Sequence, residues 1–176
     1  NDIAAEPVPS LLRGFSAPVV LDCDYTDAEL LVLLAHDTDA FNRWEAAQRL
    51  ALRRALKAIA EPGPVPAEPL NPAFLHAMRA VLRHPELDAA FKDLVLTLPS
   101  EAYIAEQLDV VDPQRVHAVR EAMRAQMARL LFDDWAWAFE THEANGAYSP
   151  DSTSAGRRAL AGLALTHLCL AAADSG

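Results

Sequence analysis

The chain has few cysteines, no long apolar run and little positive charge, and each lack argues against a class of protein. Only Cys23 and Cys169 occur in 176 residues, in unlike contexts, which favours free thiols in a reducing compartment over a disulfide. The longest apolar runs, such as Leu30 to Ala35, are too short to span a bilayer. No basic start followed by an apolar segment is present, so we expect no signal peptide within these residues. We therefore expect a cytoplasmic protein without a membrane partner.

The net charge further limits the classes of binding partner that we expect. Acidic residues number 25 and basic residues 15, which gives a formal net charge of −10. A diffuse acidic surface argues against nucleic acid and anionic membranes as partners. Hydrophobic residues make up 52% of the chain, which excludes a disordered protein. The length suffices for one domain with a real core and a piece of a second.

The strongest pattern is helical and runs from Asp112 to about His142. Asp112 suits an N-cap, and Pro113 suits the first helical position, where a missing N–H costs nothing. Apolar residues then recur at steps of three and four, as on one face of an α-helix. They are Val116, Val119, Met123, Met127, Leu130, Leu131, Trp135, Ala138 and Phe139. The pattern predicts one uninterrupted helix, roughly 45 Å long at about 1.5 Å per residue.

Further helices are predicted on both sides of it, separated by turns. Thr26 and Glu29 have the spacing of a capping box, and a short apolar helix follows them to near His36. The other predicted helices span about 40–60 and 71–84, begin near Asp88 and Ser100, and end with 155–173. Such a series predicts an all-α fold, a superhelical array of antiparallel helix pairs of the armadillo or HEAT kind. We expect its core between the long helix and the helices at 40–60 and 71–84.

One short segment is strand-like rather than helical. Phe15, Pro18, Val19, Val20 and Leu21 predict a β-strand, and Pro18 restricts it to an edge or a break. A lone strand is not stable in water. We therefore expect this strand to belong to a sheet outside the sequence or to pair with a second copy.

Residues that can bind metals or do acid–base chemistry are present without the spacing of a site. No two histidines lie four apart on one predicted helix beside a carboxylate, which favours surface or capping roles. The histidines are His36, His76, His84, His117, His142 and His167. Asp22 and Asp24 are too few ligands for a cation. Asp133 and Asp134 are consecutive and so do not share a helix face.

The remaining candidates are basic, aromatic and hydroxyl side chains. Arg49, Arg53 and Lys57 recur at steps of four, which permits an anion site, although a solvated helix face is the favoured interpretation. Trp135 and Phe139 are expected in the core, whereas Trp137 is expected to face a neighbouring domain. No serine has the context of a nucleophile elbow. The serines considered are Ser10, Ser16, Ser100, Ser149, Ser152, Ser154 and Ser175.

Three segments together resemble a known family. They are PSLLRGFSAPV at Pro9 to Val19, NRWEAAQ at Asn42 to Gln48, and the stretch from Leu96 to Met123. They resemble bacterial aminopeptidase N, the zinc-dependent alanyl aminopeptidases. The resemblance implies that residues 1–25 are the last strand of an incomplete β-sandwich domain. It implies that residues 26–176 are the first half of a C-terminal α-helical domain.

The resemblance also implies what the chain does and lacks. The family binds zinc through a His-Glu-x-x-His helix and a distant glutamate, and it removes N-terminal residues from peptides. Here the nearest sequence is His142-Glu143, with Gly146 where the second histidine would stand. We therefore expect no catalytic, cofactor-binding or metal residue in this chain, and zinc only in the parent enzyme.

Partners follow from the same resemblance. The helical domain is expected to close over the catalytic domain of the same parent chain and to restrict the access of peptide substrates. The final helix lacks a polar outer face, so we also expect self-association through the ends of the chain. The alternative is a freestanding helical-repeat module that binds a protein partner. A self-contained hydrolase is disfavoured because the nucleophile and metal patterns are missing.

Overall fold

The computed structural model describes residues 7–15, 19, 23–143 and 148–173. Within these segments the regular structure is helical, with no strand. After a 3-10 turn, η1 (Arg13–Phe15), come α1 (Asp27–His36), α2 (Ala40–Ala60), α3 (Pro72–Arg83), α4 (Ala89–Leu96), α5 (Glu101–Ala105), α6 (Pro113–Leu130), α7 (Phe132–His142) and α8 (Ser152–Ala173). The predicted all-α class is confirmed, and α8 begins three residues earlier than expected. None of the described helices is both long and apolar enough to cross a membrane.

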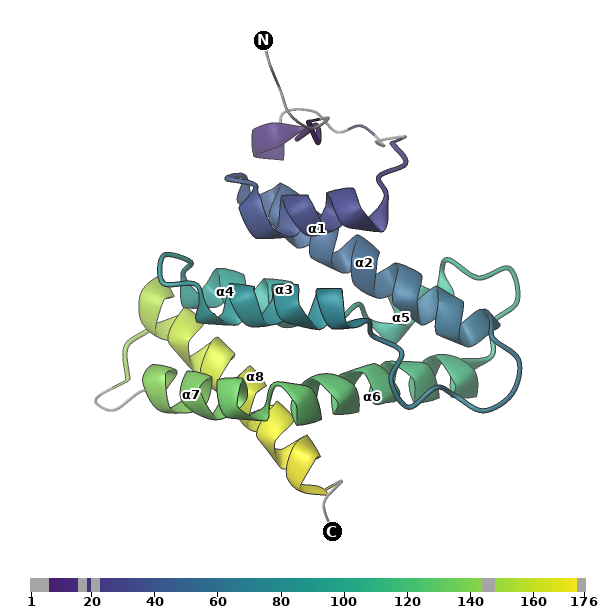
Figure 1. The fold of residues 1–176 in the computed structure, drawn as a ribbon. Coiled ribbons are helices and arrows are strands. Elements are labelled where there is room, and N and C mark those ends of the chain that lie inside the picture. Colours follow the sequence, from purple (N-terminus) through teal and green to yellow (C-terminus); the bar gives the residue numbers. More distant parts are fainter. Residues whose placement is uncertain (1–6, 16–18, 20–22, 144–147, 174–176) are drawn as a thin grey trace.

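The helices stack in pairs, as an armadillo-like array requires (Figure 1). Helix α1 packs on α2, α3 packs on α4, and α7 packs on α8. Helix α2 also contacts α4 and α6, and α8 crosses α4 and α6 as well as α7. The stack of antiparallel pairs predicted from the sequence is therefore the observed arrangement.

Side chains at the helix starts fix where each helix begins. Thr26 and Glu29 form the predicted capping box, in which Thr26 accepts from the Glu29 N–H and the Glu29 carboxylate accepts from the Thr26 N–H. At the next four helix starts the cap accepts from the backbone N–H three residues on. These caps are Asp39, Asn71, Asp88 and Ser100. Asp112 with Pro113 opens α6 as predicted.

The single long helix predicted from Asp112 to about His142 is wrong, because the chain breaks there into α6 and α7. Leu131 lies between the two helices, with φ −114° and ψ 22°. These angles lie outside the α-helical range. The apolar stripe continues across the break, so the periodicity of the sequence does not reveal it.

Side chains from outside the ladder accompany the break. The Arg79 guanidinium of α3 donates to the Leu130 carbonyl at 3.0 Å. The Trp135 indole donates to the Met127 carbonyl at 3.1 Å. A side chain that bonds into the carbonyl ladder is a recognised cause of a helix kink. Arg79 is about fifty residues away in sequence, so this cause is tertiary.

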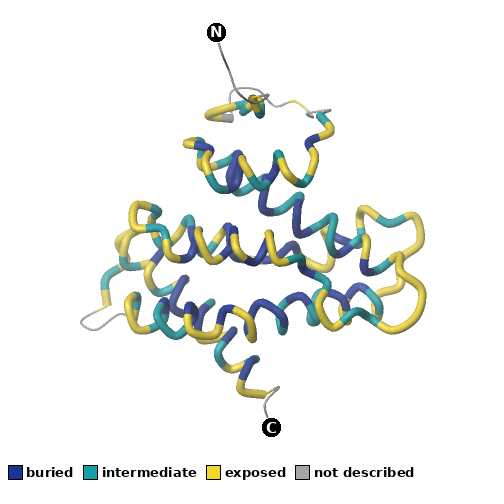
Figure 2. Tube along the Cα trace, viewed as in Figure 1, coloured by how far each residue is buried: buried dark blue, intermediate teal, exposed yellow. Residues whose placement is uncertain are grey.

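The core follows the inner sides of the stacked helices (Figure 2). Met127 and Trp135 are fully buried, as predicted, and Leu50, Phe74 and Leu82 are buried with them. The predicted core left out α8, which contributes fully buried residues such as Leu160 and Ala164. Much of the apolar surface expected to be exposed on the last helix is thus covered within the chain, although Leu165 remains 46% exposed.

The predicted N-terminal strand is not confirmed. Phe15 ends the 3-10 turn, and Val19 lies in no regular element and is exposed. Pro18, Val20 and Leu21 lie outside the described residues, as does Asp22. The division into a sandwich strand (1–25) and a helical domain (26–176) therefore stays a prediction.

Candidate functional site

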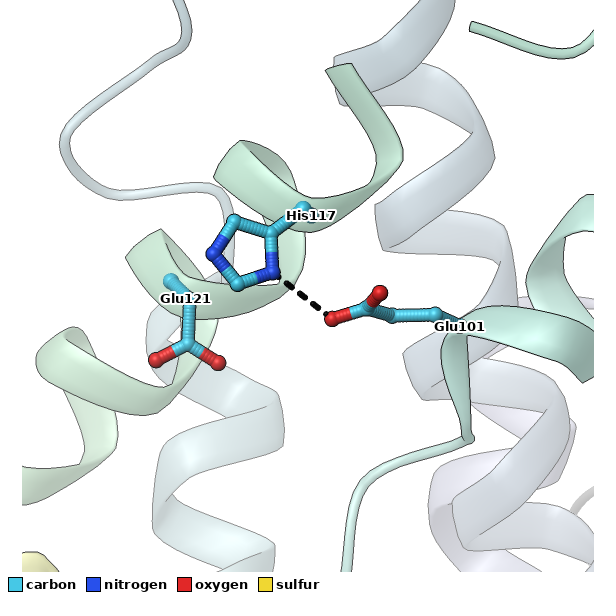
Figure 3. A group of neighbouring side chains, drawn as sticks. All are labelled: Glu101, His117 and Glu121. Atoms are coloured by element: carbon cyan, nitrogen blue, oxygen red, sulfur yellow. Dashed lines mark hydrogen bonds and ion pairs between the residues drawn. The ribbon is translucent and has the colours of Figure 1, made fainter. Parts of the chain in front are cut away.

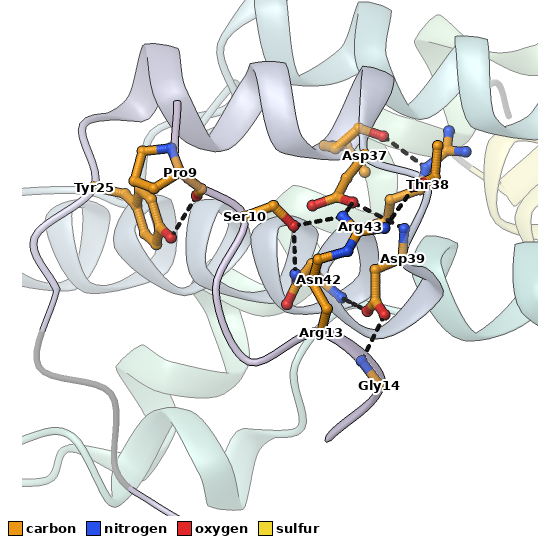
Figure 4. Close-up of polar contacts among 11 residues, drawn as sticks. Pro9, Ser10, Arg13, Gly14, Tyr25, Asp37, Thr38, Asp39, Asn42 and Arg43 are labelled. Atoms are coloured by element: carbon orange, nitrogen blue, oxygen red, sulfur yellow. Dashed lines mark hydrogen bonds and ion pairs between the residues drawn. The ribbon is translucent and has the colours of Figure 1, made fainter. Parts of the chain in front are cut away.

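A polar cluster joins the segment before α1 to the turn between α1 and α2 (Figure 4). Arg13 donates to Asp37 at 2.7 Å, to Thr38 at 2.6 Å and to Ser10 at 2.8 Å. The Gly14 N–H donates to Asp39, whose other oxygen caps α2. These bonds hold the N-terminal segment on the end of the first helix pair.

Asp37 is the centre of this cluster. Its side chain is only 1% exposed, whereas that of Arg13 is 49% exposed. Burial raises the pKa of the Asp37 carboxyl, but bonds from Ser10, the Asp39 N–H and Arg13 outweigh it, so the pKa is lowered. One oxygen, Oδ2, is buried without a hydrogen-bond partner among the described residues. The charged side chains of this cluster are fixed by their hydrogen bonds, and they connect two segments of the chain rather than offering groups for a reaction. We call this cluster the joint.

Two further residues complete the joint. The Asn42 amide donates to Ser10 at 2.9 Å. The Tyr25 hydroxyl donates to the Pro9 carbonyl at 2.8 Å, and burial raises the pKa of that hydroxyl. The sequence pattern did not reveal this joint, because Arg13 and Asp37 are 24 residues apart in the chain and no spacing rule pairs them.

A second cluster combines Glu101 of α5 with His117 and Glu121 of α6 (Figure 3). One ligand atom of each lies within 4.8 Å of the others, and His117 pairs with Glu101 at 2.9 Å. His117 and Glu121 lie four apart on α6 and so share a helix face, which is the part of this cluster that the sequence spacing indicates. Arg124 already binds Glu121 at 2.8 and 2.9 Å, and this cation competes with any metal there. The cluster is therefore best described as a surface ion-pair network.

The nearest match to the zinc-binding pattern of the family, His142-Glu143, does not gather further ligands among the described residues. His142 lies at the end of α7, with Nδ1 2.9 Å from the Ala138 carbonyl oxygen. Burial lowers the pKa of His142. Gly146 lies outside the described residues. Since no second histidine or glutamate converges on His142 there, these residues do not fit a zinc ion.

The basic stripe on α2 is largely paired within the chain. Arg49 binds Glu45 at 2.8 Å, and Arg53 binds Asp27 at 3.0 Å. Lys57 is exposed. This supports the interpretation of the stripe as a solvated helix face over that of an anion site.

Asp133 and Asp134 have different roles, as their consecutive positions predicted. Asp134 is buried, and its two oxygens accept from Arg79 at 2.6 Å and Arg83 at 2.7 Å. Burial raises the pKa of Asp134, but the two guanidinium groups outweigh it and lower the pKa. Asp133 is exposed. The two carboxyls therefore do not form an acid–base pair.

The remaining predicted residues have structural surroundings. Arg83 lies 4.3 Å above the Trp137 ring, so Trp137 is a cation–π partner within this chain. Phe139 is partly buried against the core. Asp24 is exposed. Both cysteines are free, as predicted. The described serines serve mainly as caps and hydrogen-bond partners, for example Ser10, Ser100 and Ser149.

Comparison with known proteins identifies this arrangement. A family described as "Domain of unknown function (DUF3458_C) ARM repeats" matches residues 27–176. Aminopeptidase N of Caulobacter vibrioides is 40% identical over 160 residues, 91% of this chain and 18% of that protein. Aminopeptidase N of Haemophilus influenzae is 37% identical over 168 residues, 96% of this chain and 19% of that protein.

A solved structure agrees in fold. The crystal structure of Legionella pneumophila aminopeptidase A in complex with aspartic acid aligns with a TM-score of 0.81 at 27% identity. The alignment covers 98% of this chain and 21% of that chain. The chain thus spans about a fifth of the length of the relatives that it matches. The chain belongs to the DUF3458_C family of ARM-repeat domains and is homologous to a part of bacterial aminopeptidase N.

Proposed function

We propose that this chain is a non-catalytic helical part of a zinc-dependent aminopeptidase that removes N-terminal residues from peptides in the cytoplasm. The observation that carries the proposal is the identity of 37–40% to aminopeptidase N over most of the chain. In the parent, zinc-activated water would attack the peptide carbonyl, with ligands supplied by other parts of that chain.

The proposed role of the helical stack is to enclose the active site and restrict the access of peptides. In a stack of paired helices each pair buries its apolar face on the next, so the pairs form one continuous body that can cover a site. The joint around Asp37 supports this role, since it holds the segment before α1 firmly on the first pair. The proposed partners are the catalytic part of the same chain and its peptide substrates, and no nucleic acid or membrane.

Catalysis is tested on the 176-residue chain with an alanyl chromogenic substrate and added zinc. We expect no turnover, because the chain lacks the His-Glu-x-x-His pattern, with Gly146 where the second histidine of its nearest match would stand. Turnover that a chelator abolishes would overturn this part of the proposal. The parent enzyme, assayed beside it, shows that the conditions support hydrolysis.

Enclosure is tested in the parent enzyme with Arg13→Ala, which removes three bonds of the joint. If the stack restricts access, a looser joint should raise the hydrolysis of long peptides relative to dipeptides. Arg129→Ala is the control, because Arg129 forms one exposed ion pair with Glu68, far from the joint in sequence. An unchanged ratio in the Arg13 variant would argue against the enclosing role.

The alternative is a freestanding helical-repeat module that binds a protein partner. In that case the 176-residue chain would be stable by itself and would bind a protein that is not a peptidase.

Self-association through the chain ends is a further proposal, supported by exposed apolar side chains such as Leu165 and Val19. Light scattering over a concentration series tests it, and a strict monomer at high concentration would contradict it.

A further inference from the structure

A pocket of about 300 Å³ lies where α4, α6 and α8 meet. Leu96 ends α4, and Thr97 and Leu98 follow it. Arg120 and Arg124 come from neighbouring turns of α6, and Leu163 and His167 come from neighbouring turns of α8. These seven residues line the pocket, and no acidic side chain is among them. In a chain with a net charge of −10, this concentration of positive charge stands out.

Both arginines are held in place by their neighbours. Arg120 Nε donates to the Pro99 carbonyl at 2.8 Å. Arg124 Nη1 donates to both oxygens of Glu121, at 2.8 and 2.9 Å. The side chains are 21% and 28% exposed, respectively. A guanidinium has five N–H donors, so each arginine keeps donors for a ligand. Fixed donors reduce the entropy lost on binding.

His167 forms the buried side of the pocket. It is only 4% exposed and stacks on Trp135, with ring centroids 4.2 Å apart and planes at 16°. Its Nδ1 lies 3.0 Å from the Leu163 carbonyl oxygen, which can only accept, so Nδ1 carries a proton. Nε2 is then the acceptor nitrogen of the neutral ring. The positive charge of Arg124 helps to lower the pKa of His167, after the larger effect of burial.

The apolar walls decide the class of ligand. Leu96 and Leu98 are buried, and Leu163 is partly buried against the core. A free phosphate would lose its hydration against these leucines without an apolar part to gain from them. A carboxylate with a short aliphatic body satisfies both parts, since guanidinium groups bind planar carboxylates in a bidentate manner. A volume of about 300 Å³ lies at the small end of ligand pockets.

We propose that this pocket binds a small aliphatic carboxylate, with Arg120 and Arg124 on the carboxylate and the three leucines around the aliphatic body. This goes beyond the proposed function, because the pocket contains no group for peptide hydrolysis. The bound anion would lie between Arg120 and Arg124, which both pair with Glu121. Anion binding would also favour the protonated form of His167.

The proposal is tested by titrating the 176-residue chain with isovalerate at neutral pH. The imidazole signals of His167 are followed by NMR and assigned by their loss in His167→Gln. We expect a saturable shift with isovalerate and none with isovaleramide, which has the same shape without the charge. Bound isovalerate should also raise the pKa of His167. No saturable shift, or equal binding of the amide, would overturn the proposal.

Variants then locate the binding. Arg120→Gln and Arg124→Gln should each weaken isovalerate binding by about tenfold, since each removes charge-assisted hydrogen bonds. Arg53→Gln is the control, because Arg53 also pairs with a carboxylate but lies on α2. If an arginine variant unfolds, the comparison of isovalerate with isovaleramide in the unsubstituted 176-residue chain still tests the proposal. Binding of phosphate without isovalerate would overturn the assigned ligand class.

Discussion

The side chain of Gln126 pairs with the backbone of Leu70 in both directions. Gln126 Nε2 donates to the Leu70 carbonyl at 2.9 Å, and Gln126 Oε1 accepts from the Leu70 N–H at 2.7 Å. Both residues are buried, at 2% and 3% exposure, respectively. The pair joins the loop before α3 to the C-terminal part of α6, where water cannot replace either bond.

Gln126→Leu should therefore destabilise the fold strongly. It leaves the N–H and C=O of Leu70 buried without partners, and each such group costs about 1–3 kcal/mol. We expect a loss of about 2–4 kcal/mol in the free energy of unfolding, measured by urea denaturation. Gln48→Leu is the control, since its amide makes one exposed bond to Thr97. Equal losses in both variants would contradict the buried pairing.

Gly156 marks the close crossing of α8 over α4. A Cβ at this position would lie 2.8 Å from the Ala90 backbone nitrogen and 2.9 Å from its Cβ. Gly156→Ala should lower the free energy of unfolding by about 1–2 kcal/mol through overpacking. Gly162→Ala on the same helix has open space and should raise it by about 0.5–1 kcal/mol. Thermal melts of both variants check this, and shifts of the same sign would count against it.

Arg115 holds the end of α2 and the start of the loop after it. Its guanidinium donates to the carbonyls of Ala58, Ile59, Glu61 and Gly63. Arg115→Ala should cost about 2–3 kcal/mol, because hydrogen bonds from a charged donor are worth more than neutral ones. It should also make the loop at 61–69 more sensitive to limited proteolysis. Arg129→Ala, which removes an exposed ion pair, should cost less than about 1 kcal/mol. Unchanged proteolysis in the Arg115 variant would refute the capping role.

His167 should make stability depend on pH. Burial, aided by the charge of Arg124, lowers its pKa below the ordinary value of 6.5. Below pH 6.5 the unfolded chain takes up a proton that the folded ring resists, so the free energy of unfolding falls as the pH falls. Above that pH the ring is neutral in both states and contributes no slope.

The measurement is the melting temperature of the unsubstituted 176-residue chain and of its His167→Gln variant between pH 8 and pH 5. Below pH 6.5 the melting temperature of the variant should fall less steeply than that of the unsubstituted chain. His142, whose pKa burial also lowers, accounts for a remaining slope of the same sign. If the melting temperatures of the unsubstituted chain and the variant depend on pH identically, His167 is not the source of the pH dependence.

Helix positions were predictable because their causes are local. The capping box at Thr26 and the caps at Asn71 and Asp112 act within three residues of themselves. Burial of Met127 and Trp135 followed from periodicity alone. The break at Leu131 was not predictable, because Arg79 enters the carbonyl ladder from another helix.

The candidate sites show the same division more sharply. Arg13 and Asp37, like Arg124 and His167, are far apart in the chain, and no spacing rule pairs them. The sequence by itself determined the helices, their caps, the apolar faces and the resemblance to a family. Only the tertiary structure decided which charges meet, where the long helix breaks and where a pocket remains. The physical reason is that caps and periodicity act over one or two turns, whereas ion pairs and pockets depend on how separate helices pack.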